Sequence, residues 1–201
     1  MYDNIDSYEF PEGDIMVTIR KYEEKDYENV RFVCLNSEGP DEAPDHDTGV
    51  FILDTFCNYY IENEPENCFV ADDDGRAVGY IICAENYDKF KAVFDEKYLP
   101  RSKQFGEERY GWAYNAYNAQ AKFKDEYPAH LHIDILPEYH RMGLGGKLVA
   151  ALRENLASKG IEGVCLTCGP KNERAVNFYK KRGFTLLSID DEDACFGIKT
   201  K

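Results

Sequence analysis

Three titratable side chains alternate along one short stretch of the chain. His130, His132 and Asp134 are separated by Leu131 and Ile133, so an extended strand would place all three on one face. A carboxylate or a neutral imidazole on such a face can act as a general base, and histidine has the ordinary pKa that best matches neutral pH. The other reading is a buried face whose imidazoles are satisfied by backbone groups. The pattern leaves both proton transfer and packing open.

A glycine-rich turn follows this strand. Gly143, Gly145 and Gly146 stand where the turn becomes an amphipathic helix, so exposed N–H groups at a helix N-terminus are predicted to bind an anion. Arg141 and Lys147 add positive charge to the helix dipole there. The spacing fits neither the Gly-x-Gly-x-x-Gly dinucleotide fingerprint nor the Gly-x4-Gly-Lys-Ser/Thr nucleotide loop. The turn is therefore predicted to be a phosphate site of another kind.

Two blocks of sequence carry a resemblance to a known family. The turn resembles motif A of the GNAT superfamily of acetyl-CoA-dependent N-acetyltransferases, Gln/Arg-x-x-Gly-x-Gly/Ala. The matching residues are His140, Arg141, Met142, Gly143, Leu144 and Gly145. His140 departs from the family's Gln or Arg, although an imidazole still offers a donor to a phosphate. Residues 172–184, NERAVNFYKKRGF, resemble the family's Asn-x-x-Ala-x-x-Phe-Tyr-x-x-x-Gly-Phe signature. Because the motifs occur in order and about 30 residues apart, the chain is identified as a member of this superfamily.

The resemblance implies a co-substrate and the residues that hold it. Acetyl-CoA is expected, with its phosphates on the glycine turn and its pantetheine arm hydrogen-bonded to the strand backbone near Ile135 and Leu136. Tyr179 is expected near the cofactor sulfur, as the acid that protonates the leaving thiolate. No metal is expected. The full set of expected cofactor-binding residues is Ile135, Leu136, His140, Arg141, Met142, Gly143, Leu144, Gly145, Gly146, Asn172 and Tyr179.

The resemblance also implies the reaction, which is direct attack of a primary amine on acetyl-CoA in a ternary complex. The run from Ala129 to His132 resembles the His-x-His of serotonin N-acetyltransferase. Asp134 lies closer to the turn and His132 has the better-matched pKa, so the two rank equally as the base, and His130 is expected to line the substrate site with them. A catalytically inactive GNAT-fold module that recognises a peptide or a CoA derivative is the alternative. A larger acyl group than acetyl stays open as well.

Hydrophobic periodicity predicts a single α/β domain over residues 1–201, built around a mixed sheet. The resemblance implies that this domain has a GNAT fold, whose mixed, mostly antiparallel sheet is flanked by helices. Residues 38–49 are predicted to be an acidic loop. The predicted strands are 14–21, 68–71, 77–84, 131–136, 163–168, 185–189 and 194–199, and the predicted helices are 23–35, 50–61, 145–159 and 172–182.

Residues 85–127 are unusually rich in aromatic side chains interleaved with charged ones. They are predicted to form a helical insertion before the fourth strand, of about two helices divided at Leu99-Pro100. We expect the aromatics to pack the insertion onto the body of the domain rather than to build a substrate pocket. With this insertion, the chain looks similar to the acetyltransferase-like domain of some protein O-GlcNAcases and to its free-standing bacterial relatives.

The composition of the chain favours some classes of binding partner and disfavours others. The net charge is −14, which disfavours nucleic acid, but residues 140–182 carry nine Lys and Arg against three Glu. A basic patch on an acidic protein suits an anionic cofactor and a cationic small-molecule or peptide amine. The seven scattered cysteines, with no long apolar run and an acidic N-terminus, predict a cytoplasmic protein with reduced thiols and no membrane partner. The oligomeric state is left open, a homodimer included.

Overall fold

The computed structural model describes residues 17–39 and 43–201. The acidic N-terminus, the start of the predicted first strand and part of the predicted acidic loop lie outside these residues. The described strands form one sheet in the order β1-β2-β3-β4-β5-β7-β6. They are β1 (Thr18–Lys21), β2 (Phe69–Asp73), β3 (Arg76–Ala84), β4 (Ala129–Ile135), β5 (Gly163–Cys168), β6 (Thr185–Ile189) and β7 (Ala194–Lys199). Only β4 and β5 run parallel, so the predicted mixed, mostly antiparallel sheet is confirmed.

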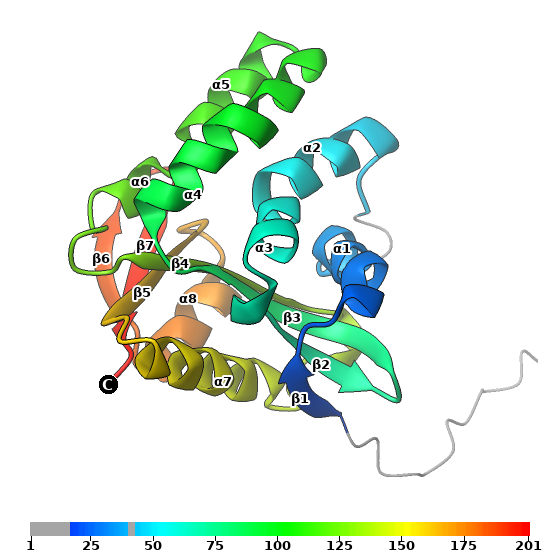
Figure 1. Cartoon of the computed structure of the whole chain (residues 1–201), viewed down its shortest axis with the longest axis vertical. Helices are drawn as coiled ribbons and strands as arrows, with labels where there is room; N and C mark the ends of the chain where they lie inside the picture. Colours follow the sequence, from blue (N-terminus) through cyan, green and yellow to red (C-terminus); the bar gives the residue numbers. More distant parts are fainter. Residues whose placement is uncertain (1–16, 40–42) are drawn as a thin grey trace, which may run out of the picture.

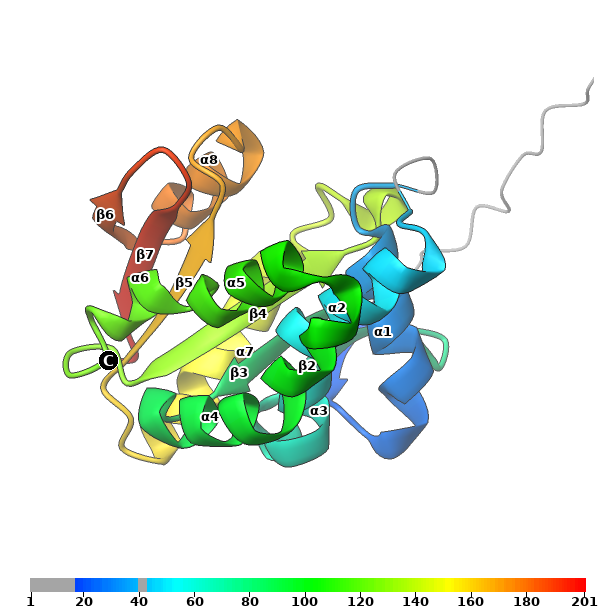
Figure 2. The same ribbon diagram turned by 90° about the horizontal axis from the view of Figure 1, so that it is seen from above.

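Helices cover both faces of the sheet. The first six lie on one face, and α7 and α8 lie on the other (Figures 1 and 2). They are α1 (Tyr27–Asn36), α2 (His46–Phe56), α3 (Asn58–Asn63), α4 (Tyr87–Val93), α5 (Glu107–Asn115), α6 (Asn118–Ala121), α7 (Leu144–Ser158) and α8 (Glu173–Lys181). Within the described ranges, no helix is long and apolar enough to cross a bilayer.

The helix α7 follows the predicted pattern closely. Leu148, Leu152 and Leu156 recur at helical spacing and are at most 1% exposed, and they face the sheet. On the same side, α8 ends at Gly183, whose φ of 84° lies in the left-handed region that glycine adopts at no steric cost. The first sequence motif leads into α7, and the second forms α8.

The segment between α1 and β2 differs from the sequence prediction. Residues 46–49 were expected in a loop, but Asp45 accepts a hydrogen bond from the Thr48 N–H at 3.0 Å and so caps a helix that begins at His46. The predicted helix 50–61 is also two helices, because the backbone at Cys57 leaves helical geometry (φ −126°, ψ −58°). The result is a bent pair, α2 and α3, above the middle of the sheet (Figure 1).

The long connection from β3 to β4 is helical, as predicted, but its break lies elsewhere. The helix α4 continues as a π-helical turn (Phe94–Tyr98) and a 3-10 helix (Leu99–Phe105), so the chain stays helical through Pro100. It turns instead at Gly106, where φ is 98°. Phe90 and Phe94 are at most 1% exposed and belong to the main core. The connection is therefore packed into the body of the protein.

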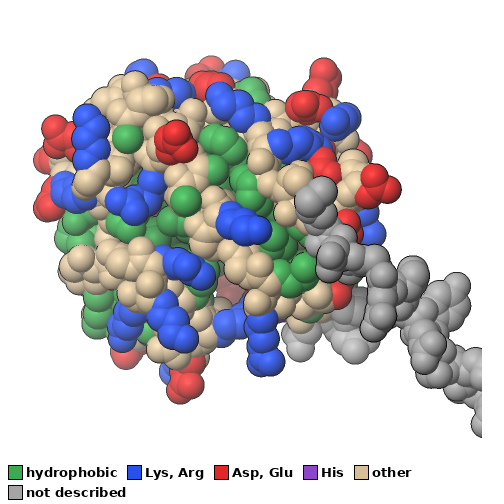
Figure 3. Space-filling view, turned by 90° about the horizontal axis from the view of Figure 1, so that it is seen from below, with side chains coloured by type: hydrophobic (Ala, Val, Ile, Leu, Met, Phe, Trp, Pro, Cys, Tyr) green, Lys and Arg blue, Asp and Glu red, His purple; other side chains and the backbone are tan. Residues whose placement is uncertain are grey.

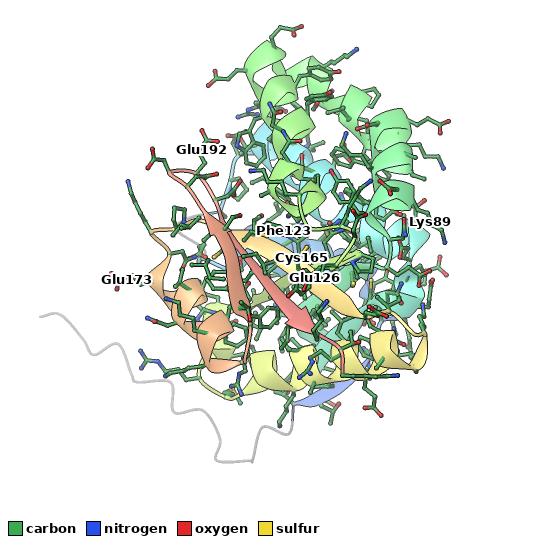
Figure 4. All side chains as sticks on the ribbon, turned by 90° about the vertical axis from the view of Figure 1, so that its left-hand side faces the viewer. Lys89, Phe123, Glu126, Cys165, Glu173 and Glu192 are labelled. Atoms are coloured by element: carbon green, nitrogen blue, oxygen red, sulfur yellow. The ribbon has the colours of Figure 1, made fainter. Side chains whose placement is uncertain are left out.

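A second, smaller core lies where the end of this connection meets β5 and β7. Cys165 is buried there with Cys195 and Tyr127, and Phe123 packs against them. Figure 4 shows Phe123 and Glu126 beside Cys165 at this end of the sheet. All seven cysteines are free thiols.

Candidate functional site

The sheet opens at its centre, between its two parallel strands. β4 and β5 are paired only at Ala129 with Val164 and at His130 with Cys165. Beyond this point the strands separate, and the gap forms the floor of a cavity of about 810 Å³. Residues from β4, β5, α7, α8 and the end of α1 line it. The cavity therefore brings together both sequence motifs and the titratable face of β4.

The backbone of β4 directs hydrogen-bonding groups toward this gap, although the Ile135 carbonyl already contacts His140 Nε2 at 2.8 Å. The Leu136 N–H donates to the Val78 carbonyl at 3.0 Å, and the Leu136 carbonyl accepts from Tyr139 N–H at 3.0 Å. Because backbone groups alternate in direction along a strand, Ile133 and Ile135 direct theirs away from β3, toward the gap. Ile135, one of the two residues expected to contact the cofactor through the backbone, lines the cavity. Leu136, the other, does not, because its backbone groups are already paired and its side chain is buried; Ile133 lines the cavity instead.

At one end of the cavity the glycine turn leads into α7. Gly143 adopts φ 78° and precedes the helix, so the N–H groups of Leu144 and Gly145 in its first turn have no acceptor within the helix. Arg141 also has a left-handed backbone, with φ 66°. Together these residues line the cavity, while the Met142 side chain, also expected to contact the cofactor, is 40% exposed and lies outside the lining.

Gly145 and Gly146 serve close packing between α7 and α8. A Cβ at Gly145 would come within 2.9 Å of the Phe178 ring, and a Cβ at Gly146 within 2.6 Å of the Arg182 guanidinium carbon. The same guanidinium lies 5.7 Å from the centroid of Phe178. These glycines therefore let an arginine of the second motif reach the N-terminus of α7.

His140 is held by protein groups on both sides of its ring. Its Nε2 lies 2.8 Å from the Ile135 carbonyl, and its Nδ1 lies 3.2 Å from Nη1 of Arg174. Since a carbonyl accepts and a guanidinium donates, Nε2 carries the proton and Nδ1 is the acceptor. The predicted role of this ring as a phosphate donor does not fit that arrangement, because both nitrogens are engaged. His140 instead ties the end of β4 to α8.

Positive charge rims the cavity. Arg141, Arg174, Lys181 and Arg182 line it, against the carboxylates of Glu38 and Asp134. On the face shown in Figure 3, Lys and Arg side chains surround a strip of hydrophobic surface, and the acidic side chains lie mainly near the outline. This field, together with the N-terminus of α7, favours a polyanion.

Asp134 lines the cavity from the face of β4 that also carries His132. Its Oδ2 accepts a hydrogen bond of 2.5 Å from the hydroxyl of Tyr80, the residue opposite it on β3. Burial raises the pKa of Asp134 to about 6, and the hydrogen bonds from Tyr80 and Ser37 oppose that rise. A carboxyl group with such a pKa is largely ionised at neutral pH yet more basic than an ordinary aspartate.

The two histidines of β4 differ in their surroundings. His132 lines the cavity, and burial lowers its pKa to about 4. His130 is 1% exposed, lies outside the cavity lining and is surrounded by rings, with the Phe90 centroid 4.4 Å away. Burial, and then the neighbouring His132, lowers the pKa of His130 to about 3. The expected place of His130 in the substrate site is therefore not what the structure shows; it belongs to the aromatic core.

The second motif supplies the opposite wall. Tyr179 lines the cavity, and burial, followed by the charge of Asp134, raises its pKa well above the ordinary value. Asn172 precedes α8, and its Oδ1 accepts from the Ala175 N–H at 3.0 Å, which makes it the N-cap of that helix. Its side-chain NH₂ keeps its donors beside the cavity. Tyr179 and Asp134 thus face one space from two sides of the gap.

Several residues in or beside the cavity could not be assigned from the sequence. Ser37 and Glu38 come from the end of α1, and Glu38 pairs with Arg174 at 2.9 Å. Tyr80 comes from a different strand, so only the register of β3 on β4 reveals it. The excess of Lys and Arg in residues 140–182 was the one signal that pointed toward Arg174 and Arg182. Among the residues that the structure describes, no group of His, Cys, Asp and Glu is arranged to hold a metal ion.

Comparison with known proteins decides the family. The sequence model described as "Acetyltransferase (GNAT) family" matches residues 19–184, which is most of the chain. The chain belongs to the GNAT acetyltransferase family. In this GNAT protein the first motif lies at the N-terminus of α7 and the second in α8, and residues of both line the cavity.

Solved structures agree with this GNAT assignment. The structure named SsHAT has a TM-score of 0.82 and 28% identity, covering 92% of this chain and 98% of its own. The PaiA N-acetyltransferase of Thermoplasma acidophilum, solved with coenzyme A, has a TM-score of 0.60, 18% identity and coverage of 92% and 99%. The Drosophila melanogaster polyamine N-acetyltransferase, which forms N-acetylagmatine, has a TM-score of 0.64, 16% identity and coverage of 92% and 100%. The last two similarities concern the fold alone.

Proposed function

We propose that this GNAT protein transfers the acetyl group of acetyl-CoA to a primary amine by direct attack in a ternary complex. One observation carries the proposal: a buried carboxylate, Asp134, and a buried phenol, Tyr179, face the same cavity, which ends at a cationic helix N-terminus. These are the groups that acetyl transfer from a thioester needs. A base must take a proton from the amine, and an acid must supply one to the thiolate.

The cavity fits an extended anionic cofactor. Leu144 and Gly145 N–H groups, with Arg182 beside them, would hold the pyrophosphate. The gap-facing backbone of Ile133 and the N–H of Ile135 would pair with the amides of the pantetheine arm, as an added strand pairs with a sheet edge. The side-chain NH₂ of Asn172 would donate to the same arm. The thioester would then lie between the two walls of the gap.

The reaction step follows from this placement. The amine nitrogen forms a bond to the thioester carbonyl carbon, and the bond from that carbon to sulfur breaks. Asp134 accepts the proton that the amine nitrogen loses, directly or through water, and Tyr179 gives its proton to the sulfur. A protonated alkylamine loses one further proton to solvent before attack, at a cost of about 4.6 kcal/mol for an ordinary lysine-like pKa at neutral pH.

The acceptor that the charges favour is cationic. Asp134 and Glu38 are the acidic groups of the lining, and the chain outside residues 140–182 carries a net charge of −20. Structural neighbours include the Drosophila polyamine N-acetyltransferase and an agmatine N-acetyltransferase. We therefore propose a small cationic amine or a peptide amine as the acceptor class.

His132 is the second candidate for the base. It lies two residues before Asp134 and lines the same cavity, but its pKa of about 4 makes it a weak proton acceptor. Asp134, with a pKa of about 6, keeps a proton more readily and remains ionised at neutral pH. We therefore place Asp134 first, although the sequence ranked the two residues equally.

Three further proposals accompany the function. We propose that residues 1–201 form one domain in which residues 85–127 are an insertion, since its aromatic side chains share the main core. The similarity to the acetyltransferase-like domain of protein O-GlcNAcases rests on that insertion and on the sequence before the turn. A cytoplasmic location and a homodimer stay predictions from the sequence.

A binding module without catalysis is the rival, and the engaged ring of His140 favours it. Calorimetric titration of the purified chain with acetyl-CoA, beside desulfo-CoA and ATP, separates the outcomes. Binding of acetyl-CoA that ATP does not match, followed by thiol release with an amine, supports the enzyme. Binding without thiol release across an amine panel supports the module, and no binding of any CoA derivative contradicts both.

A further inference from the structure

Tyr80 occupies a distinctive position behind the proposed base. It lies opposite Asp134 in the register of β3 on β4, is 1% exposed and is absent from the cavity lining. Its hydroxyl donates to Oδ2 of Asp134 at 2.5 Å. Because Tyr80 cannot reach the cavity, any effect that it has on a reaction there must pass through Asp134.

The other groups around Asp134 come from three elements. Ser37 and Glu38 face it from the end of α1, and Arg174 and Tyr179 face it from α8. His132 is its neighbour on the same face of β4. Glu38 and Arg174 are paired with each other, so their opposite charges at Asp134 partly cancel.

Tyr80 differs from Glu38 and Arg174 in being buried. It is buried between the sheet and α1, and burial, followed by the charge of Asp134, raises its pKa well above the ordinary value. The phenol therefore stays protonated and donates its hydrogen to the carboxylate. Glu38 and Arg174, in contrast, are more than half exposed.

We propose that Tyr80 is a positioning residue for the base: it holds Oδ2, turns Oδ1 toward the acceptor nitrogen and stabilises the carboxylate form of Asp134. This inference rests on the proposed function. A hydrogen bond to a charged acceptor is stronger than one between neutral groups, and a buried charge gains most from it. The sequence could not reveal this role, since 54 residues separate the two partners.

The matched pair of variants is Tyr80→Phe and Tyr59→Phe. Tyr59 is also a buried tyrosine, 3% exposed, and its hydroxyl donates to Oε1 of Glu64 at 2.7 Å. Glu64 is not part of the cavity lining. Each variant removes one hydroxyl and one bond to a carboxylate, so a general effect of losing a buried bond would appear in both.

The first readout is the titration of Asp134 by carbon-13 NMR of the side-chain carboxyl, with assignment by Asp134→Asn. Tyr80→Phe is expected to raise the pKa of Asp134 by about one unit, and Tyr59→Phe to leave it unchanged. This experiment needs no substrate. An Asp134 titration that is the same in Tyr80→Phe and in the natural chain would overturn the proposal even if the enzyme is active.

The second readout is the pH profile of kcat/KM for the amine. Its acid limb is expected to move up by about one pH unit in Tyr80→Phe. At pH values below the pKa of Asp134, kcat/KM of the variant should then be about tenfold lower than that of the natural chain. Adding Tyr80→Phe to Asp134→Asn should then cost nothing further, because Tyr80 acts through that carboxylate. Additive losses would contradict a positioning role. Should the NMR shift appear in a protein with no acetyl transfer, the proposed function fails and the Tyr80 contact stands.

If Tyr80→Phe does not fold, the natural chain still tests the contact. A hydroxyl proton donated to a carboxylate resonates downfield, and the signal of Tyr80 should disappear in Asp134→Asn. A Tyr80 hydroxyl signal that persists unchanged in that variant would overturn the proposal.

Discussion

Arg182 lies against the backbone of Gly146, so closely that a Cβ on that glycine would come within 2.6 Å of the guanidinium carbon. One residue belongs to the end of α8 and the other to the first turn of α7. The contact places a permanent positive charge beside N–H groups that have no acceptor in their own helix. The two sequence motifs, 32 residues apart at their starts, thereby form one anion site.

A methyl group at position 146 should damage this site. In Gly146→Ala the guanidinium must move, so we expect the Kd for acetyl-CoA to rise about tenfold, the cost of one charge-assisted bond. Calorimetric titration measures it. Gly111→Ala is the control, because a Cβ there would meet nothing within 4 Å. Equal affinities for acetyl-CoA in the two variants would show that binding does not depend on the contact between Arg182 and Gly146.

Removing the guanidinium should weaken binding in a salt-dependent way. Arg182→Gln is expected to raise the Kd for CoA about tenfold at low salt and less at high salt, since screening weakens the phosphate contact in the natural chain. The control is Lys180→Gln, which removes an exposed charge of α8 outside the cavity lining. Titrations at two ionic strengths measure both effects. Similar losses of CoA affinity in the two variants would mean that Arg182 acts only through the overall positive charge of the protein and makes no specific contact.

The pH profile should identify the base. Asp134 has a pKa of about 6 and His132 of about 4, so kcat/KM should show an acid limb near pH 6 if Asp134 takes the proton. Asp134→Asn is expected to abolish this limb and to lower kcat about 100- to 10,000-fold, whereas His132→Gln should keep the limb. The ionisation of the amine is common to all variants and cancels in the comparison. A limb lost in His132→Gln and kept in Asp134→Asn would reverse the assignment.

His130 should make stability fall in acid. Its folded pKa of about 3 lies below the ordinary value of 6.5, so the unfolded chain binds the proton first as the pH falls. The stabilisation is complete above pH 6.5 and is lost as the pH drops toward 3, by about 2 kcal/mol between pH 7 and pH 5. Urea unfolding of His130→Phe should show a smaller pH slope than the natural chain.

Asp134 changes the pH dependence of stability with the opposite sign, because its pKa is raised in the folded state. That contribution is the same in His130→Phe and in the natural chain, so it cancels in the comparison. His46→Gln is the matched control, since the His46 side chain is 88% exposed. A slope that is unchanged in His130→Phe, or changed equally in His46→Gln, would contradict the burial of an uncharged His130.

The sequence predicted best where local pattern and tertiary burial agree. The strands at residues 163–168, 185–189 and 194–199 were predicted to the residue, and α8 closes at Gly183 as its composition indicates. Pro100 shows the limit. A proline in the first turn of a 3-10 helix costs no hydrogen bond, so the chain continued past it and turned at Gly106.

The candidate site shows the same division between local and long-range information. Gly143 and Asp134 were candidates from residue type and spacing, because each lies in a short pattern, and Tyr179 was a candidate from its resemblance to a family motif. Tyr80, Ser37 and Glu38 have no local signal, since strand register and the packing of α1 bring them to Asp134. The engagement of His140 by Arg174 likewise depends on how α8 docks, which no spacing along the chain records.

The most direct test of the central claim is product formation. The purified chain would be incubated with acetyl-CoA and a panel of primary amines that includes agmatine, a diamine and a lysine peptide. Mass spectrometry of the amines would be read beside release of the CoA thiol. We predict N-acetylated amine and free CoA thiol in equal amounts, with both lost in Asp134→Asn. Acetyl-CoA binding with no acetylated amine across the panel, or equal product from Asp134→Asn, would contradict the account.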